Sequence, residues 1–112
     1  VFAPFGFFLG LDPSEILLEG NLLGSKLVLN EFVAFQQLGS MISSMDYRTG
    51  MICAISLCGF ANFSSLGICV SGIAVLCPEK KSTLARLVFK AMLGGVAASL
   101  ISAMTVGLVT LC

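Results

Sequence analysis

Histidine is absent from this chain, and charged residues make up only 11% of its 112 residues. Histidine is the commonest general base in enzymes and the commonest metal ligand. The chain therefore lacks the residue on which most proton-transfer and zinc sites depend. Lysine plus arginine and aspartate plus glutamate number 6 each, which leaves no net charge. Because no basic excess is present, the composition does not indicate a nucleic acid as partner.

The chain also lacks any Cys-x-x-Cys pair. Disulfide frameworks and zinc sites need cysteine spacings that are absent here. We therefore interpret the cysteines as small apolar side chains. They are Cys53, Cys58, Cys69, Cys77 and Cys112.

What the chain has in abundance is apolar sequence. Hydrophobic residues make up 57% of it and the mean hydropathy is +1.04, whereas an average soluble domain carries about 25% charged residues. This composition predicts an all-α integral membrane protein with room for three or four spans of roughly 20 residues. The chain begins with Val1 rather than methionine and has no signal-peptide pattern, so we expect it to be the C-terminal part of a larger protein.

Residues 12–38 are expected to form a re-entrant helical hairpin. Two half-length helical patterns, Ser14–Leu23 and Leu27–Leu38, are joined by a glycine- and serine-containing corner within Gly20–Ser25, whose residues Gly20, Asn21, Gly24 and Ser25 break the first helix. Neither pattern is long enough to cross a bilayer, and irregular backbone at membrane depth is tolerated only inside protein or beside a cavity. The alternative is a single span over Asn21–Met45 with one buried carboxylate.

Residues 49–77 are expected to form a broken transmembrane helix. As one straight helix this uncharged run would exceed the bilayer core of about 30 Å. Its middle contains Gly59 and Gly67 on either side of an asparagine and two serines. Interrupted helices of this kind form substrate sites in secondary transporters. The alternative is that these small and polar residues only allow helices to pack closely.

The remaining segments set the topology. Residues 1–11 read as the end of a span, and residues 83–111 as the last transmembrane helix, with a face of small residues for packing. Basic residues gather around the turn Pro78–Ser82, which the positive-inside rule places in the cytoplasm, so Gly39–Arg48 and the C-terminus lie outside. These basic residues are Lys80, Lys81, Arg86 and Lys90.

Glu31 is the most informative residue of the hairpin. It follows Asn30 inside an apolar run. An ionisable group at membrane depth costs about 2.5–3.5 kcal/mol on insertion scales and usually faces a protein interior or wet cavity. Such a residue therefore marks a functional site.

If the hairpin and the helix break meet, one pocket holds a carboxylate, amides and a hydroxyl. Asn62 and Ser65 lie three residues apart and so share a face of any helical turn. This set suits a polyhydroxylated ligand such as a sugar, and equally a proton or cation. It is unsuited to catalysis, since glycoside hydrolysis needs two carboxylates and no Ser-His or Cys-His pair exists. The candidate residues are Asn30, Glu31, Asn62, Ser64 and Ser65, with Phe60 and Phe63 as aromatic walls.

Three sequence blocks resemble the C-terminal domain of the concentrative nucleoside transporters (the NupC-like nucleoside/cation symporters). They are GNLLGSKLVLNEFVAFQQL at Gly20–Leu38, ISLCGFANFSSLGI at Ile55–Ile68 and CPEKKSTLARL at Cys77–Leu87. The NEFVA and CGFANFSS motifs are the most specific, and their order and spacing also match. The resemblance covers nearly the whole chain, least securely its first 11 residues.

This resemblance implies one half of an inverted-repeat transporter in a plasma membrane, multi-pass and homotrimeric, moving its transport domain like an elevator. It implies nucleoside uptake driven by Na⁺ or H⁺ without a cofactor. Glu31 would then bind ribose hydroxyls, Asn62 and Ser65 would complete the ribose site, and Phe60 would flank the base. The coupling-ion site and nucleobase recognition would lie mainly in the missing N-terminal half.

Two alternatives remain open from the sequence. The chain could belong to a secondary transporter of another small polar solute. It could also be a non-transporting membrane assembly subunit, in which Asn62 and Ser65 only hold helices together.

Overall fold

In the computed structural model, which describes residues 1–111, all regular structure is helical, as the composition predicted. The described part measures 49 × 25 × 23 Å along its principal axes. Its elements in chain order are α1 (Ala3–Phe8), α2 (Pro13–Val28), α3 (Glu31–Met41), the 3₁₀ helix η1 (Ile42–Ser44), α4 (Tyr47–Leu57), α5 (Phe63–Leu76), the 3₁₀ helix η2 (Pro78–Lys80) and α6 (Lys81–Val109).

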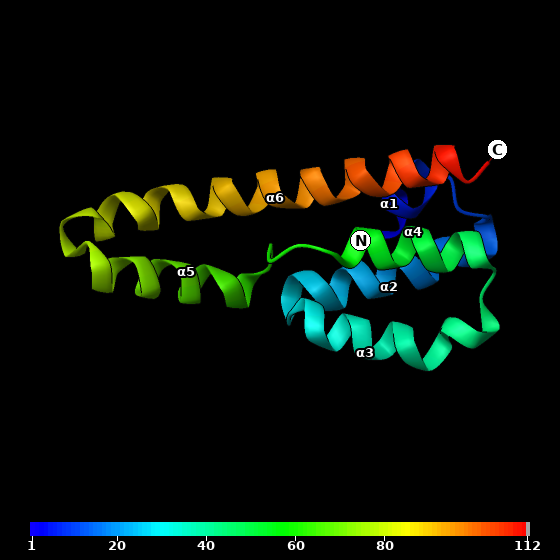
Figure 1. Cartoon of the computed structure of the whole chain (residues 1–112), viewed down its shortest axis with the longest axis horizontal. Coiled ribbons are helices and arrows are strands. Elements are labelled where there is room, and N and C mark those ends of the chain that lie inside the picture. The colour runs from blue at the N-terminus through cyan, green and yellow to red at the C-terminus, as the bar shows by residue number, and fades with distance from the viewer. Residues whose placement is uncertain (112) are drawn as a thin grey trace.

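Helix α6 extends along almost the whole molecule, and α4 and α5 follow one another beside it (Figure 1). Its 29 residues span about 43 Å. Within the described residues, Pro78–Val109 is the segment long and apolar enough to cross a membrane, and α5 is a shorter apolar helix. The helix begins at Lys81, two residues before the expected start, because the 3₁₀ turn η2 leads directly into it.

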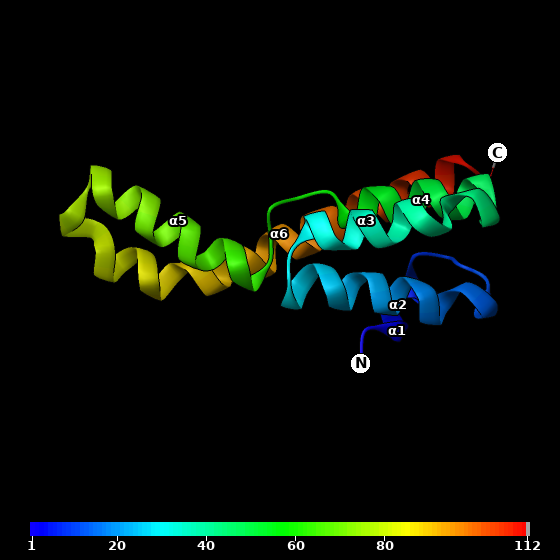
Figure 2. The same ribbon diagram turned by 90° about the horizontal axis from the view of Figure 1, so that it is seen from below.

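Helices α2 and α3 form an antiparallel pair whose corner is at Leu29 and Asn30 (Figure 2). The predicted corner at Gly20–Ser25 is wrong, because α2 continues through this stretch. The predicted helix starting at Leu27 is also wrong, since α3 begins at Glu31. Asn30 ends the corner by capping α3, with its Oδ1 accepting from the backbone N–H of Val33 at 2.9 Å.

The glycines of α2 are used for packing rather than for breaking the helix. A Cβ on Gly20 would lie 2.9 Å from the backbone nitrogen of Ala3, and one on Gly24 would lie 3.3 Å from the ring of Phe2. Glycine at both positions thus lets α1 lie directly against α2. A sequence pattern cannot distinguish this use of glycine from a turn.

We expect Gly20→Ala to destabilise the protein, because its new Cβ would meet backbone atoms that cannot move aside cheaply. Overpacking of this kind costs about 1–3 kcal/mol. Gly39→Ala is the matched control: Gly39 lies inside α3 with nothing within 4 Å, so alanine should stabilise it by about 0.5–1 kcal/mol. Thermal unfolding in detergent should shift in opposite directions for the two variants, and equal shifts would contradict this packing.

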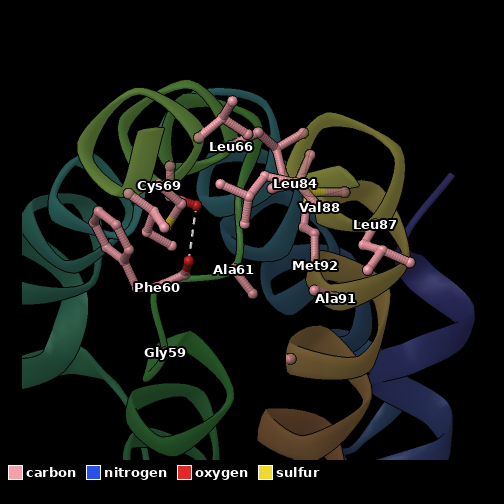
Figure 3. A pocket seen from close by; sticks show the side chains of 14 residues that line it. Gly59, Phe60, Ala61, Leu66, Cys69, Leu84, Leu87, Val88, Ala91 and Met92 are labelled. Atoms are coloured by element: carbon pink, nitrogen blue, oxygen red, sulfur yellow. Dashed lines mark hydrogen bonds between the residues drawn. The ribbon is translucent and has the colours of Figure 1, made fainter. Parts of the chain in front are cut away.

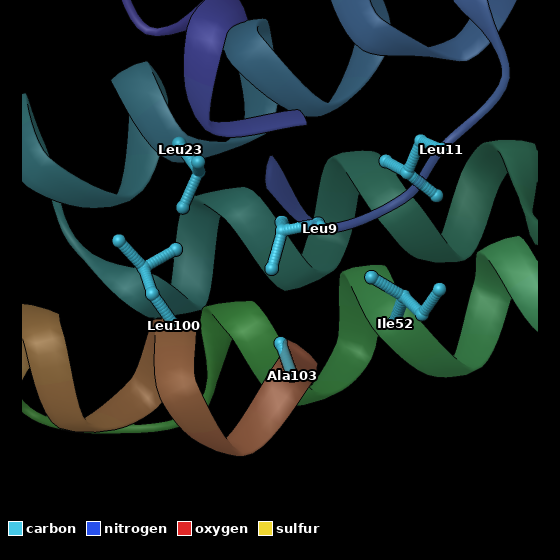
Figure 4. Close-up of a cluster of buried hydrophobic side chains, with 6 residues drawn as sticks. All are labelled: Leu9, Leu11, Leu23, Ile52, Leu100 and Ala103. Atoms are coloured by element: carbon cyan, nitrogen blue, oxygen red, sulfur yellow. The ribbon is translucent and has the colours of Figure 1, made fainter. Parts of the chain in front are cut away.

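Two apolar clusters hold the helices together. The first joins the chain start and α2 to α4 and α6 (Figure 4). The second joins the α2–α3 pair to α4. The helix pair is thereby held against the end of α4, where the chain leaves the helix. The first cluster comprises Leu9, Leu11, Leu23, Ile52, Leu100 and Ala103, and the second Leu22, Ala34, Leu38, Cys53 and Leu57.

The outward sides of α5 and α6 carry exposed apolar side chains. Val75 is 79% exposed, Leu76 86% and Leu108 67%. Such surfaces are suited to lipid or to further apolar protein segments rather than to water. The expected polar link at Gly39–Arg48 is shorter than predicted, because α3 extends to Met41 and α4 begins at Tyr47.

Candidate functional site

Between α4 and α5 the chain is non-helical over Cys58–Asn62, with extended backbone at Cys58 and Asn62 and bends between them. We call this stretch the extended segment. Gly59 has φ +114°, a conformation that side chains with a Cβ rarely adopt. Helix α4 ends at Leu57, and α5 begins at Phe63. The interruption therefore covers only the start of the Gly59–Gly67 stretch. It places the end of α4 near the beginning of α5.

Asn62 and Ser65 form a capping box at the start of α5. Asn62 Oδ1 accepts from the Ser65 backbone N–H at 2.8 Å, and Ser65 Oγ accepts from the Asn62 backbone N–H at 3.1 Å. Ser65 Oγ also contacts the Phe60 carbonyl oxygen at 2.7 Å, the bond drawn in Figure 3. Both side chains are buried, Asn62 completely. The cap thus fixes the amide of Asn62 in one orientation.

Glu31 is the residue that this fixed amide contacts. Asn62 Nδ2 donates a hydrogen bond to Glu31 Oε2, across 31 positions of sequence. Glu31 is the first residue of α3 and Asn62 immediately precedes α5, so two helix N-termini converge on one carboxylate. The N-terminal end of a helix carries a positive partial charge, which attracts acceptor groups. Figures 1 and 2 both show the corner of α2 and α3 beside the extended segment.

The other predicted site residues lie around this contact without joining it. Asn30 uses its side-chain oxygen to cap α3. Ser64 is exposed on the first turn of α5. Phe60 is 54% exposed and Phe63 52%, and the Phe63 ring lies 6.4 Å from that of Phe89. Phe60 remains available to a ligand, whereas Phe63 packs towards α6.

A cavity of about 430 Å³ lies between α5 and α6 (Figure 3). Phe60, Ala61 and Ser65 line one end of it, and the rest is almost entirely apolar. Glu31 and Asn62 do not line it. The polar groups therefore lie beside this cavity, and the cavity alone does not suit a sugar.

Sequence reasoning missed a second set of buried polar groups. Lys26 is fully buried, with its Nζ donating to the Ser56 carbonyl at 2.8 Å and to Ser99 Oγ at 3.1 Å. The Cys58 carbonyl lies 3.4 Å from the same nitrogen. Glu19 on the same helix is also fully buried, and it accepts a hydrogen bond from Ser56 Oγ.

One sequence signal could have revealed this set. Glu19 and Lys26 are seven residues apart, two turns along one face of α2, within apolar sequence. Because Gly20–Ser25 was expected to break the helix, the two were not recognised as neighbours on one face. Within residues 1–111 no cluster of three or more histidine, cysteine, aspartate or glutamate side chains could hold a metal ion.

The site therefore offers a carboxylate acceptor, an oriented amide and an aromatic ring at a gap between short helices. Carboxylates accept hydrogen bonds from hydroxyl groups, amides both donate and accept, and a ring stacks on a flat ligand. This combination binds rather than transforms, because it contains one carboxylate and no paired nucleophile and base.

Comparisons with known proteins show which proteins the chain is similar to. Residues 1–107 match the family described as "Na+ dependent nucleoside transporter C-terminus". The chain is 44% identical over 108 residues to an uncharacterized transporter, YutK, of Bacillus subtilis (strain 168), covering 96% of this chain and 27% of the relative. It is 36% identical over 110 residues to the nucleoside permease NupC of Helicobacter pylori, covering 94% and 26%.

A solved structure shares the fold. The chain matches CNTnw in an inward-facing substrate-bound state with a TM-score of 0.95 and 34% identity, over 99% of this chain and 28% of that one. This chain thus spans roughly a quarter of the length of each of these three proteins.

Proposed function

This chain belongs to the family of Na⁺-dependent nucleoside transporters, and from that premise we propose that it is the C-terminal part of a cation-coupled nucleoside transporter, in which it supplies the ribose-binding half of the site. The family match confirms the resemblance noted from the NEFVA and CGFANFSS motifs. It also confirms that the chain is not an enzyme, because its relatives are transporters.

The contact between Glu31 and Asn62 carries the proposal. A ribose presents two neighbouring hydroxyl groups, and the two oxygens of a carboxylate can accept one hydrogen bond from each. Bonds to a charged group are stronger than neutral ones. The Asn62 amide, oriented by Ser65, then donates to a remaining oxygen of the sugar.

Phe60 is placed to contact the nucleobase. It precedes Asn62 by two residues on the extended segment, and about half of its surface is exposed. Its ring offers a flat apolar face, which stacks on purines and pyrimidines alike. Asn30 and Ser64 play supporting roles, Asn30 by holding the first turn of α3.

The remainder of the proposal concerns the whole transporter. We place the Na⁺ or H⁺ site and base recognition in its N-terminal half, and α2 with α3 as a re-entrant hairpin entering from the outer side of the plasma membrane. The opposite positions of the basic turn at η2 and the α3–α4 link support this orientation (Figure 1). The complete protein would act as a homotrimer.

We expect recognition of the sugar to depend on its 2′ and 3′ hydroxyl groups. In proteoliposomes containing the full-length transporter, 2′,3′-dideoxyuridine should compete with uridine at least about 30-fold less well than unlabelled uridine does. Hydrogen bonds to charged groups contribute about 1.5–3 kcal/mol each, and 1.4 kcal/mol is tenfold in affinity. Free uracil should compete weakly.

Equal competition by uridine and its dideoxy analogue would contradict the ribose site. Uptake of a different polar solute, with no response to uridine, would instead favour a transporter of another substrate. Binding without uptake, in vesicles that hold the cation gradient, would contradict the transport function.

A further inference from the structure

The Lys26 ammonium is buried without a carboxylate among its hydrogen-bond partners in residues 1–111. All of its partners are neutral oxygens. Two are carbonyls, of Ser56 and Cys58, and the third is the hydroxyl of Ser99 on α6. Charged side chains within membrane segments pair with one another or with backbone carbonyls, and Lys26 contacts carbonyls.

The two carbonyls belong to the end of α4. Helix α4 ends at Leu57, so the Ser56 and Cys58 oxygens lie where backbone acceptors have lost their helical partners. This end of a helix carries a negative partial charge. In transporters with interrupted helices, such half-helix ends and unwound carbonyls coordinate the coupling cation. The Lys26 ammonium thus occupies the position that a monovalent cation would take at this interruption.

The same hairpin holds the interruption from both sides. Lys26, just before the corner, contacts the carbonyls at the start of the extended segment. Glu31, just after the corner, contacts Asn62 at its end. The extended segment is therefore contacted at its start by Lys26 and at its end by Glu31, two oppositely charged residues five positions apart in the sequence.

The charged groups around Lys26 support a fixed cation. Glu19 lies on the same helix and is connected to it through Ser56, whose hydroxyl donates to Glu19 while its carbonyl accepts from Lys26. One Glu19 oxygen has no hydrogen-bond partner, although it is buried. The nearby ammonium of Lys26 stabilises this carboxylate without a direct contact.

We propose that Lys26 is a built-in cation, a positioning residue whose ammonium replaces a bound ion at the α4 end and thereby fixes Asn62 for substrate. The effect on substrate rests on the proposed function. The cation role does not, because it can be measured without a nucleoside.

The test is chemical rescue in the full-length transporter. Lys26→Ala removes three carbons and the ammonium, which n-propylammonium replaces atom for atom. The purified variant should unfold at a lower temperature than the wild type, and propylammonium should raise its Tm. The neutral analogue 1-propanol, with the same number of heavy atoms, should not. Lys90→Ala, at an exposed lysine of α6, is the matched control and should respond to neither.

Uridine binding provides the second measurement. Lys26→Ala should bind uridine at least about tenfold more weakly, and propylammonium should restore the Kd to within about threefold of the wild type. If the variant folds only when propylammonium is present during extraction, that recovery supports the proposal in the same way. Rescue by 1-propanol, or by neither compound, would overturn it.

Lys26→Met gives an independent check, because methionine fills the space without the charge. Wild-type Tm and uridine affinity in this variant would overturn the proposal. If wild-type protein failed to bind uridine while propylammonium still raised the Tm of Lys26→Ala, the nucleoside function would be wrong and the built-in cation would stand.

Discussion

Replacing Glu31 by glutamine in the full-length transporter should weaken uridine binding by about 100-fold or more and abolish measurable uptake. Glutamine has nearly the size of glutamate, so the packing around α3 is kept. It offers one acceptor oxygen instead of two and carries no charge. The loss of two charge-assisted bonds, at about 1.5–3 kcal/mol each, accounts for this factor. Radiolabelled uptake and equilibrium binding both report it.

Glu79→Gln is the control for this variant. Glu79 lies in the exposed turn η2 and its replacement removes the same charge far from the hairpin corner. It should transport at the wild-type rate. Both variants should reach the membrane in equal amounts. A Glu31→Gln transporter whose uridine affinity lies within about threefold of wild type would remove Glu31 from the ribose site.

Asn62→Asp should abolish uptake although it preserves the start of α5. Aspartate caps helices as well as asparagine does, so its oxygen can still accept from the Ser65 backbone N–H. The donor to Glu31 is lost, however, and a second carboxylate faces the first. Like charges at this distance repel strongly in a poorly solvated site. We expect uridine affinity to fall by about 30-fold or more.

Two further variants separate the roles of this side chain. Asn62→Ala removes the cap as well, at about 1 kcal/mol, so it should lose both uptake and thermal stability. Asn21→Asp, on the exposed side of α2, is the matched control and should transport normally. If Asn62→Asp transported at the wild-type rate, the side chain would act only as a helix cap. Loss of the proposed trimer with unchanged affinity would favour an assembly role.

The all-helical class, the membrane setting and the family were predictable from the sequence, because each rests on local features. The hydropathy of the chain indicates membrane helices, and the NEFVA and CGFANFSS motifs identify the family. The sequence placed Glu31 and Asn62 in one pocket only on the condition that the hairpin and the helix break meet, and the structure brings the two side chains into contact. Their role towards substrate stays a prediction.

The hairpin corner was not predictable, because the signal for it was ambiguous. From the sequence alone, Gly20 and Gly24 indicate a helix break. In the structure they instead make room for α1 against α2. The true corner has no glycine, and depends on the capping side chain of Asn30. Lys26 and Glu19 were missed for the same reason: their shared face exists only if α2 is continuous, and their partners come from α4 and α6.

The unequal helix lengths bear on how the site is assembled in the membrane. Helices α3 and α4 have 11 residues and α5 has 14, so each is about 17–21 Å long and too short to cross the bilayer alone. Insertion during synthesis favours long apolar segments, and α6 is the one among the described residues that qualifies, yet it is made after the others. The short helices also carry backbone ends that lipid cannot satisfy. Among the described residues, the pocket residues are therefore translated before the one helix that is long enough to span the membrane, and we expect them to reach their final positions only once α6 is in place.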